Sequence, residues 1–147
     1  MELAELISSN YLDIQQLALN LSLNDLGVEG AISLGQRLSQ LTQLQDLNLS
    51  LRTNLIEDQG MGSLITYLST LPSLRTLHIE LCRNKFGTNN LYLLSRSLSR
   101  LSNIKELTLQ LTESNIDNAG AKNIAIGLYS LKGLESLTLN LEINIIG

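Results

Sequence analysis

Hydrophobic and polar residues alternate along five short stretches of the chain, and these stretches recur every thirty residues. Each stretch follows the pattern L-x-x-L-x-L-x-L, with Ile in some of the Leu positions, and the starts lie at residues 14, 44, 74, 104 and 134. Strict alternation predicts a strand with one buried face. A fixed period predicts a solenoid, in which each repeat buries its apolar face against its neighbours.

An asparagine follows the strand pattern in four of the five repeats, at Asn24, Asn54, Asn84 and Asn144, and Ser114 takes this place in the remaining one. An Asn side chain both donates and accepts hydrogen bonds. Stacked at one position per repeat, these residues are expected to form a structural asparagine ladder that is weaker at Ser114. Glycine or asparagine then recurs where the chain is expected to turn into a helix at positive φ. These turn positions are Gly30, Gly60, Asn90 and Gly120.

Apolar residues after this position recur at helical spacing of three and four, as in Met61, Leu64, Leu68 and Leu71. Each unit is therefore predicted to be strand, asparagine turn, helix and loop. Strands stack about 4.7–4.9 Å apart and helices about 8–10 Å apart, so we expect a curved α/β stack with the parallel sheet on its concave face and the helices on its convex face. We interpret the chain as one domain, residues 1–147. It comprises a partial N-terminal repeat or cap (1–13), the repeats 14–43, 44–73, 74–103 and 104–133, and a partial repeat (134–147).

These residues resemble leucine-rich repeats of the ribonuclease-inhibitor-like type, in which L-x-x-L-x-L-x-x-N-x-L precedes a Gly and a helix with the pattern L-x-x-x-L. The resemblance covers residues 14–147, with one departure: an additional L-x step lengthens every strand pattern before the Asn. It implies a horseshoe that binds other proteins. Some members of the family help to regulate small GTPases, others inhibit enzymes, and others are structural subunits of large assemblies.

Composition narrows the class of partner. The net charge is -4 and the pI is about 4.9, which argues against nucleic acid or an anionic membrane as the main partner. Cys82 is the single cysteine, so no internal disulfide can form. No apolar run approaches the roughly 18–20 residues of a transmembrane helix, and the N-terminus lacks the basic start of a signal peptide. We expect an intracellular protein of the cytoplasm, with no insertion into membranes.

One cluster has residues suited to chemistry: His78, Glu80 and Cys82 alternate along the third strand pattern, so we expect them on the same, concave face of the sheet. His78 and Cys82 would lie about 13 Å apart along a strand, too far for the hydrogen-bonded pair that thiol catalysis needs. The neighbouring strands offer mainly Asn, Ser, Thr and Gln, which are poor zinc ligands. The phosphate-binding, dinucleotide-binding and nucleophile-elbow motifs are absent from the sequence. We therefore expect no catalytic, metal-binding or cofactor-binding residues and no enzymatic activity.

Charge is unevenly distributed. Residues 74–103 hold five basic residues against Glu80 alone, a net of +4, within an otherwise acidic chain. This repeat is either an ordinary solvated surface or a docking patch for an acidic partner. The candidate partner-binding residues are Arg52, His78, Glu80, Arg83, Lys85, Arg96 and Arg100.

The last strand pattern, with Leu137, Leu139 and Leu141, lacks a helix to cover it in this sequence. Solenoids normally need polar capping units, so we expect further repeats or another chain to cover this edge. The first functional hypothesis is a non-catalytic interaction or scaffolding module that belongs to a larger assembly. The alternative is a regulator of an enzyme, a GTPase-activating or inhibitory horseshoe that uses Arg52 or Arg83 at its rim.

Overall fold

Strands and helices alternate along the chain in the computed structural model, which describes residues 13–86 and 91–147. The N-terminal partial repeat is therefore outside the described residues except for Asp13, and so is Asn90. The elements, in order, are β1 (Gln16–Asn20), α2 (Gly27–Leu38), β2 (Asp46–Ser50), α3 (Glu57–Leu68), β3 (Thr76–Glu80), α4 (Tyr92–Leu98), β4 (Glu106–Gln110), α5 (Asn118–Tyr129) and β5 (Ser136–Asn140).

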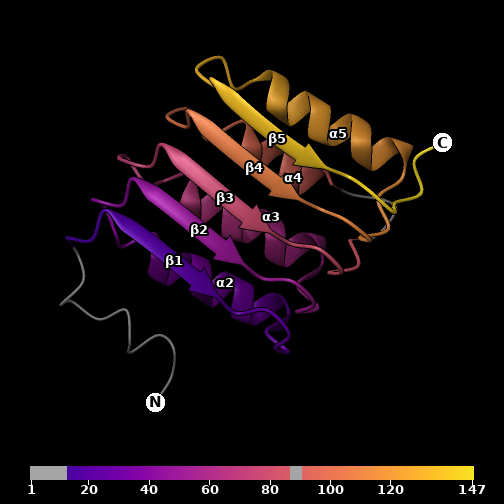
Figure 1. The fold of residues 1–147 in the computed structure, drawn as a ribbon, viewed down its shortest axis with the longest axis horizontal. Helices are drawn as coiled ribbons and strands as arrows, with labels where there is room; N and C mark the ends of the chain where they lie inside the picture. Colours follow the sequence, from indigo (N-terminus) through magenta and orange to yellow (C-terminus); the bar gives the residue numbers. More distant parts are fainter. Residues whose placement is uncertain (1–12, 87–90) are drawn as a thin grey trace.

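The five strands form one parallel sheet in the order of the sequence, β1 to β5 (Figure 1). Every strand residue lies opposite the residue thirty positions later, so that Leu49 pairs with Ile79 and Ile79 with Leu109. These three side chains are buried in one column. The thirty-residue register and the alternation within each strand are confirmed. The strands are shorter than predicted, because each ends before the last Leu of its pattern, as β3 ends at Glu80 before Leu81 and Cys82.

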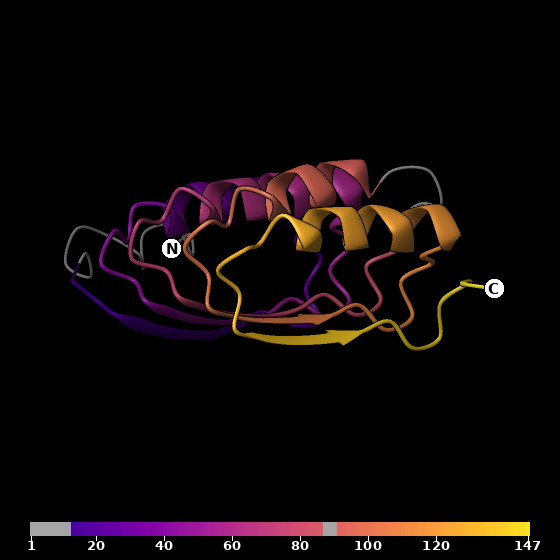
Figure 2. The ribbon, with the colours of Figure 1, turned by 90° about the horizontal axis from the view of Figure 1, so that it is seen from above.

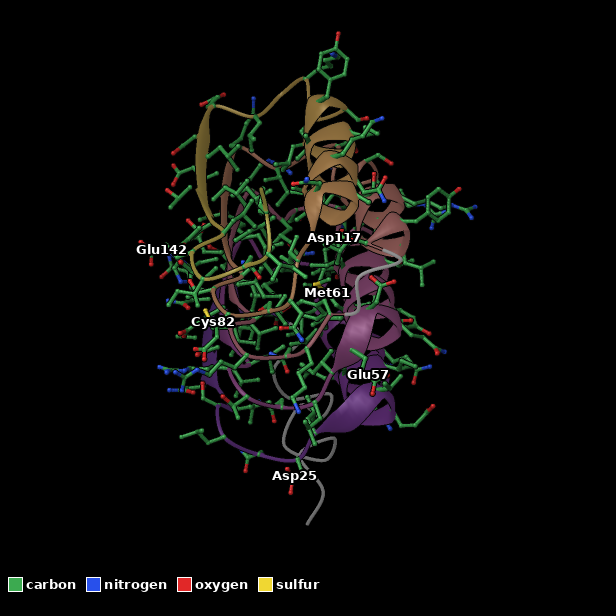
Figure 3. All side chains as sticks on the ribbon, turned by 90° about the vertical axis from the view of Figure 1, so that its right-hand side faces the viewer. Asp25, Glu57, Met61, Cys82, Asp117 and Glu142 are labelled. Atoms are coloured by element: carbon green, nitrogen blue, oxygen red, sulfur yellow. The ribbon has the colours of Figure 1, made fainter. Side chains whose placement is uncertain are left out.

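All the described helices lie on the same side of the sheet, as Figure 2 shows from above. The side chains between the two layers form one hydrophobic core (Figure 3), to which each helix contributes residues at the predicted spacing. In α3 and the loop after it, these are Met61, Leu64, Leu68 and Leu71, all buried. The other face of the sheet carries no described helix. None of the helices in the described ranges is sufficiently long and apolar to cross a membrane.

The expected role of the repeated glycines is wrong. Gly30, Gly60 and Gly120 do not form the turns into the helices at positive φ; each lies inside the first turn of its helix. Glycine fits at these positions because neighbouring atoms leave little room for a side chain. A Cβ on Gly60 would lie 2.9 Å from Cγ2 of Ile56 and 3.2 Å from Cα of Val28 in the preceding helix. Positive φ occurs earlier, at Gly27, the first residue of α2.

The helices differ in length. α2, α3 and α5 have 12 residues each, whereas α4 has 7. Gly62 of α3 allows α4 to approach closely, because a Cβ there would lie 2.6 Å from Cβ of Leu93. The third repeat thus departs from the others on the helix side of the molecule.

Candidate functional site

Asparagines after the strands tie neighbouring repeats together. The Nδ2 of Asn54 donates to the Leu21 carbonyl at 2.8 Å, that of Asn84 to the Leu51 carbonyl at 2.9 Å, and that of Asn144 to the Leu111 carbonyl at 2.9 Å. In each case the acceptor belongs to the preceding repeat, 33 residues earlier. The side-chain oxygen also contributes, since Oδ1 of Asn84 accepts from the backbone amide of Asn54 at 3.0 Å.

Two repeats depart from this pattern. Asn24 is exposed, and among the described residues its Nδ2 donates within its own loop, to the carbonyls of Leu21 and Ser22. Ser114 is fully buried, and its Oγ donates to Thr112 of its own repeat at 3.1 Å. Among the described residues, no side-chain bond from position 114 reaches the third repeat. The asparagine network is therefore interrupted between the third and fourth repeats.

The loops at the asparagines hold a feature that sequence reasoning missed. Residues on one or both sides of each asparagine slot adopt left-handed backbone with φ between 51° and 62°, although none is glycine. Such conformations are uncommon for residues with a Cβ and persist where surrounding bonds fix them. The only signal for them in the sequence is that they occupy equivalent positions of successive thirty-residue repeats. The residues are Leu23, Thr53, Leu55, Arg83, Lys85, Glu113, Asn115 and Ile143.

The seven candidate partner-binding residues do not form one site. The structure distributes them over three places: the open face of the sheet, the loops after the strands, and the helix side of the third repeat. His78 and Glu80 belong to the first group, Arg52, Arg83 and Lys85 to the second, and Arg96 and Arg100 to the third.

On the open sheet face, Glu80 takes part in a hydrogen-bonded row across three repeats. The Oγ of Ser50 donates to Oε2 of Glu80 at 2.6 Å, and the hydroxyls of Ser22 and Ser50 lie 2.8 Å apart. His78 borders a shallow hollow of about 490 Å³ over β1, β2 and β3. This face is polar and carries few large side chains, which suits recognition through many small contacts.

Two of the three loop cations are exposed without an ion partner among the described residues, namely Arg52 and Lys85. Arg83 forms an ion pair with Glu113 of the next repeat. Both partners are about half exposed, so this pair contributes little to stability. Arg83 is nevertheless occupied by its own chain, which makes Arg52 the better candidate at this edge.

A hollow of about 340 Å³ lies between α3 and the helix of the third repeat. Its walls bring together the exposed Arg96 and Arg100, the aromatic ring of Tyr67 and the partly exposed Leu93. The Tyr67 hydroxyl accepts a hydrogen bond from Nε2 of Gln36 at 3.0 Å, which holds the ring in place. The remaining lining residues are Gly62, Ser63, Thr66 and Ser97.

Cys82 was expected on the open face, beyond Glu80 on the same strand. Its side chain is only 9% exposed and lies just after the strand, which ends at Glu80, but it is not part of the hydrophobic core between sheet and helices. No group of three or more His, Cys, Asp or Glu residues that could hold a metal occurs in the ranges 13–86 and 91–147.

Asp58, in the first turn of α3, was not identified from the sequence. Burial raises the pKa of its carboxyl group to about 6. Its Oδ1 is buried, with no hydrogen-bond partner in the described part of the chain. The sequence does not distinguish Asp58 from its neighbour Glu57, which is exposed. The difference in burial between the two carboxyl groups comes from the three-dimensional packing.

The apolar positions of β5 are less covered than their counterparts. Leu137 is 45% exposed, whereas Leu107, its register partner in β4, is 1% exposed. Ile143, Ile145 and Ile146, which follow the other end of the strand, are also exposed. We call these four residues together the β5 edge.

Comparison with known proteins adds little to this geometry. No family model matches the chain, and no curated protein matches it at a significant level. Among solved structures, it is similar to an internalin from Listeria monocytogenes, with 16% sequence identity and a TM-score of 0.44. The match covers 99% of this chain and 46% of the internalin chain, so the chain spans less than half of that protein's length. The five-stranded parallel sheet with alternating helices itself fits a leucine-rich repeat array.

Proposed function

We propose that this chain is a non-catalytic protein–protein interaction or scaffolding module, and that it works as a subunit or segment of a larger assembly. Purely parallel sheets usually have both faces covered, but here the described helices cover only one (Figure 2). This open, polar face is the observation that carries the proposal. It offers a row of strand positions that repeats in register across five strands, which is suited to contact another protein surface.

We further propose that the array is a ribonuclease-inhibitor-like horseshoe, with the repeat boundaries inferred from the sequence and its open face concave. A further repeat or another chain would cover the β5 edge, since exposed apolar patches commonly mark interaction sites. Cytoplasmic residence remains part of the proposal, supported by the single cysteine. The GTPase-activating or inhibitory alternative is less well supported, because Arg83, one of its two candidate residues, already pairs with Glu113.

Photo-crosslinking from the open face tests the proposed function. A benzophenone amino acid at Asn48 or Thr108, both on the open face, should capture the same protein in cells of the source organism. An excess of unlabelled chain should compete for this protein, whereas excess chain carrying Asn48→Arg and Thr108→Arg should not. A matched probe at Thr70, exposed after α3, is the control.

Capture that is equal from all three positions, or that the doubly substituted chain also competes, would contradict the proposal. The alternative function is tested in the same experiment. If the captured protein is an enzyme and the purified chain changes its rate, the chain is a regulator. If Arg52→Ala abolishes the change in the enzyme's rate, Arg52 is the residue through which the chain regulates the enzyme.

A further inference from the structure

The helix side of the third repeat holds two arginines that have no ion partner among residues 13–86 and 91–147. Arg96 lies in the last turn of α4, and Arg100 follows four residues later, just beyond the helix. Residues four apart on a helical surface are neighbours. Neither guanidinium group makes a hydrogen bond or ion pair with a described residue, whereas Arg83 and Lys105 both have ion partners. Two guanidinium groups on one wall of a hollow present several N–H donors to an anion.

None of the residues that line this hollow is acidic. The acidic residues of the helices lie in the first turns, at Glu29, Glu57 and Asp58. Asp58 lies one turn before Gly62, the first residue of α3 that lines the hollow, about 6 Å away along the helix axis. The lining itself therefore carries two positive charges and no negative charge, even though the whole chain is acidic.

The apolar wall of the hollow is formed by Leu93 of α4 and Tyr67 of α3, one residue from each helix. Leu93 is 39% exposed beside the hollow, and the ring of Tyr67 is fixed by its bond to Gln36. The hydroxyl groups of Thr66 and Ser97 also line the hollow and are hydrogen-bonded to each other, with their oxygens 2.7 Å apart. Ser97 also donates to the Gly62 carbonyl. Since these hydroxyls are already bonded, the ligand is expected to bind through the arginines and the apolar wall.

We infer that this hollow binds an acidic segment of a partner protein, with a carboxylate between Arg96 and Arg100 and an adjacent aliphatic side chain against Leu93 and Tyr67. The inference rests on the proposed interaction function and names a second contact surface for it, on the helix side. A protein segment fits better than nucleic acid, because the chain is acidic overall and only one aromatic ring lines the hollow.

Fluorescence anisotropy with three labelled synthetic peptides tests the inference. The first peptide repeats Glu-Glu-Leu, the second replaces Glu by Gln, and the third replaces Leu by Ser. We expect the first to bind best and to weaken as salt is raised, because salt screens the exposed charges. The double variant Arg96→Gln, Arg100→Gln should weaken its binding by about tenfold or more, since hydrogen bonds to charged groups are the strong ones.

A matched variant separates the hollow from the overall charge. Arg37→Gln with Lys132→Gln removes the same two charges from neighbouring helix ends, outside the hollow, and should leave peptide binding within about twofold, as for exposed charges that make no contact. Leu93→Ser should weaken the first peptide and leave the third unchanged. Circular dichroism checks that every variant is folded.

Several results would overturn the inference: equal losses from both double variants, no preference for Glu over Gln, or no binding of the first peptide. Tighter binding of a labelled thymidine oligonucleotide or of anionic lipid vesicles would replace the protein segment with that ligand. If the peptides fail while the sheet-face crosslink is still competed, the hollow is refuted and the proposed function stands. If both fail, the proposed function is also refuted.

Discussion

At the scale of single residues, the asparagine slot shows how one side chain serves two repeats. Asn84 lies between the second and third repeats, where its Nδ2 donates to Leu51 and its Oδ1 accepts from Asn54. A buried amide of this kind is stabilising only because both of its ends are bonded. The sequence predicted these positions and the weak link at Ser114, because the period aligns identical residues. It did not predict the left-handed residues beside them, which follow from loop geometry.

Ser114→Asn should repair the interrupted network. The new Nδ2 would reach the Leu81 carbonyl, as Asn144 reaches Leu111, and its Oδ1 would accept from the backbone amide of Asn84. A net gain of about 0.5–1.5 kcal/mol in the free energy of unfolding is expected for a neutral hydrogen bond. Urea unfolding measures it, and Asn84→Ser is the reverse control, which should destabilise. A loss of stability in Ser114→Asn would show that the slot lacks room for the amide.

Asp58→Asn should change the pH dependence of stability. The pKa of Asp58 is about 6 in the folded chain and 3.8 as a reference value, so the folded state binds the proton more tightly. The protonated carboxyl group therefore stabilises the folded chain at low pH, and this contribution is lost as pH rises from about 4 through 6. The variant should be more stable than the wild type at about pH 8, with the difference shrinking at about pH 4.

Urea midpoints at both pH values check this prediction. Glu57→Gln removes a negative charge from the same helical turn at an exposed position and serves as the control. An advantage of Asp58→Asn that is the same at both pH values would indicate a loss of charge repulsion rather than of a buried carboxylate.

At the scale of elements, the strands were predictable and the helix contacts were not. Alternation along Asp46–Ser50 or Glu106–Gln110 fixes which side chains are buried, because the period of a strand is two. Helix spacing predicted all four helices, but it did not predict that α4 is shorter or that Leu93 lies directly against Gly62 of α3. The contacts of the misread glycines were not predicted either. Their small size leaves room for the apolar side chain four residues earlier, Leu26, Ile56 or Ile116, and for Gly60 also for the preceding helix.

Leu109→Ala tests the buried column of the sheet. Leu109 is 1% exposed between Ile79 and Leu139 in the register, so truncation should cost about 2–5 kcal/mol of unfolding free energy. Thr108→Ala, one residue away on the open face, should stay within about 0.5 kcal/mol. Chemical denaturation of both variants measures the difference. Similar costs at the two positions would contradict the assignment of the buried and open faces.

Gly127→Ala tests the contact between α4 and α5. Alanine normally favours a helix over glycine by about 1 kcal/mol. Here a Cβ would lie 2.7 Å from the Ser95 carbonyl oxygen and 2.9 Å from its Cα. Because the obstacle is backbone, we expect a loss of about 1–3 kcal/mol, as for overpacked cores. Gly133→Ala, whose nearest atom is 3.8 Å away, is the tolerated control. A gain in thermal stability for Gly127→Ala would show that the helices separate freely.

At the scale of the whole molecule, the apolar side chains are well buried in the middle of the stack and less buried at its β5 end. The core is continuous from Ala31 to Leu131, whereas the β5 edge leaves Leu137 and Ile143 exposed. The strand pattern of residues 134–141 repeats the earlier ones, so the sequence predicted the apolar positions of this edge. The distribution of the seven candidate residues over three surfaces was not predicted, because it depends on how strands, loops and helices are arranged in space.

The β5 edge gives a test of the assembly proposal that is independent of charge. The purified chain should associate as its concentration rises, since burying exposed apolar surface contributes about 25 cal/mol per Å². Leu137→Gln should weaken this association, and added salt should not, which distinguishes the edge from the arginine hollow. Light scattering coupled to size exclusion measures the mass, and Thr138→Gln, on the neighbouring residue of the same strand, is the control. A wild-type chain that stays monomeric at every concentration, or an equal effect of both substitutions, would remove the β5 edge from the candidate contact surfaces.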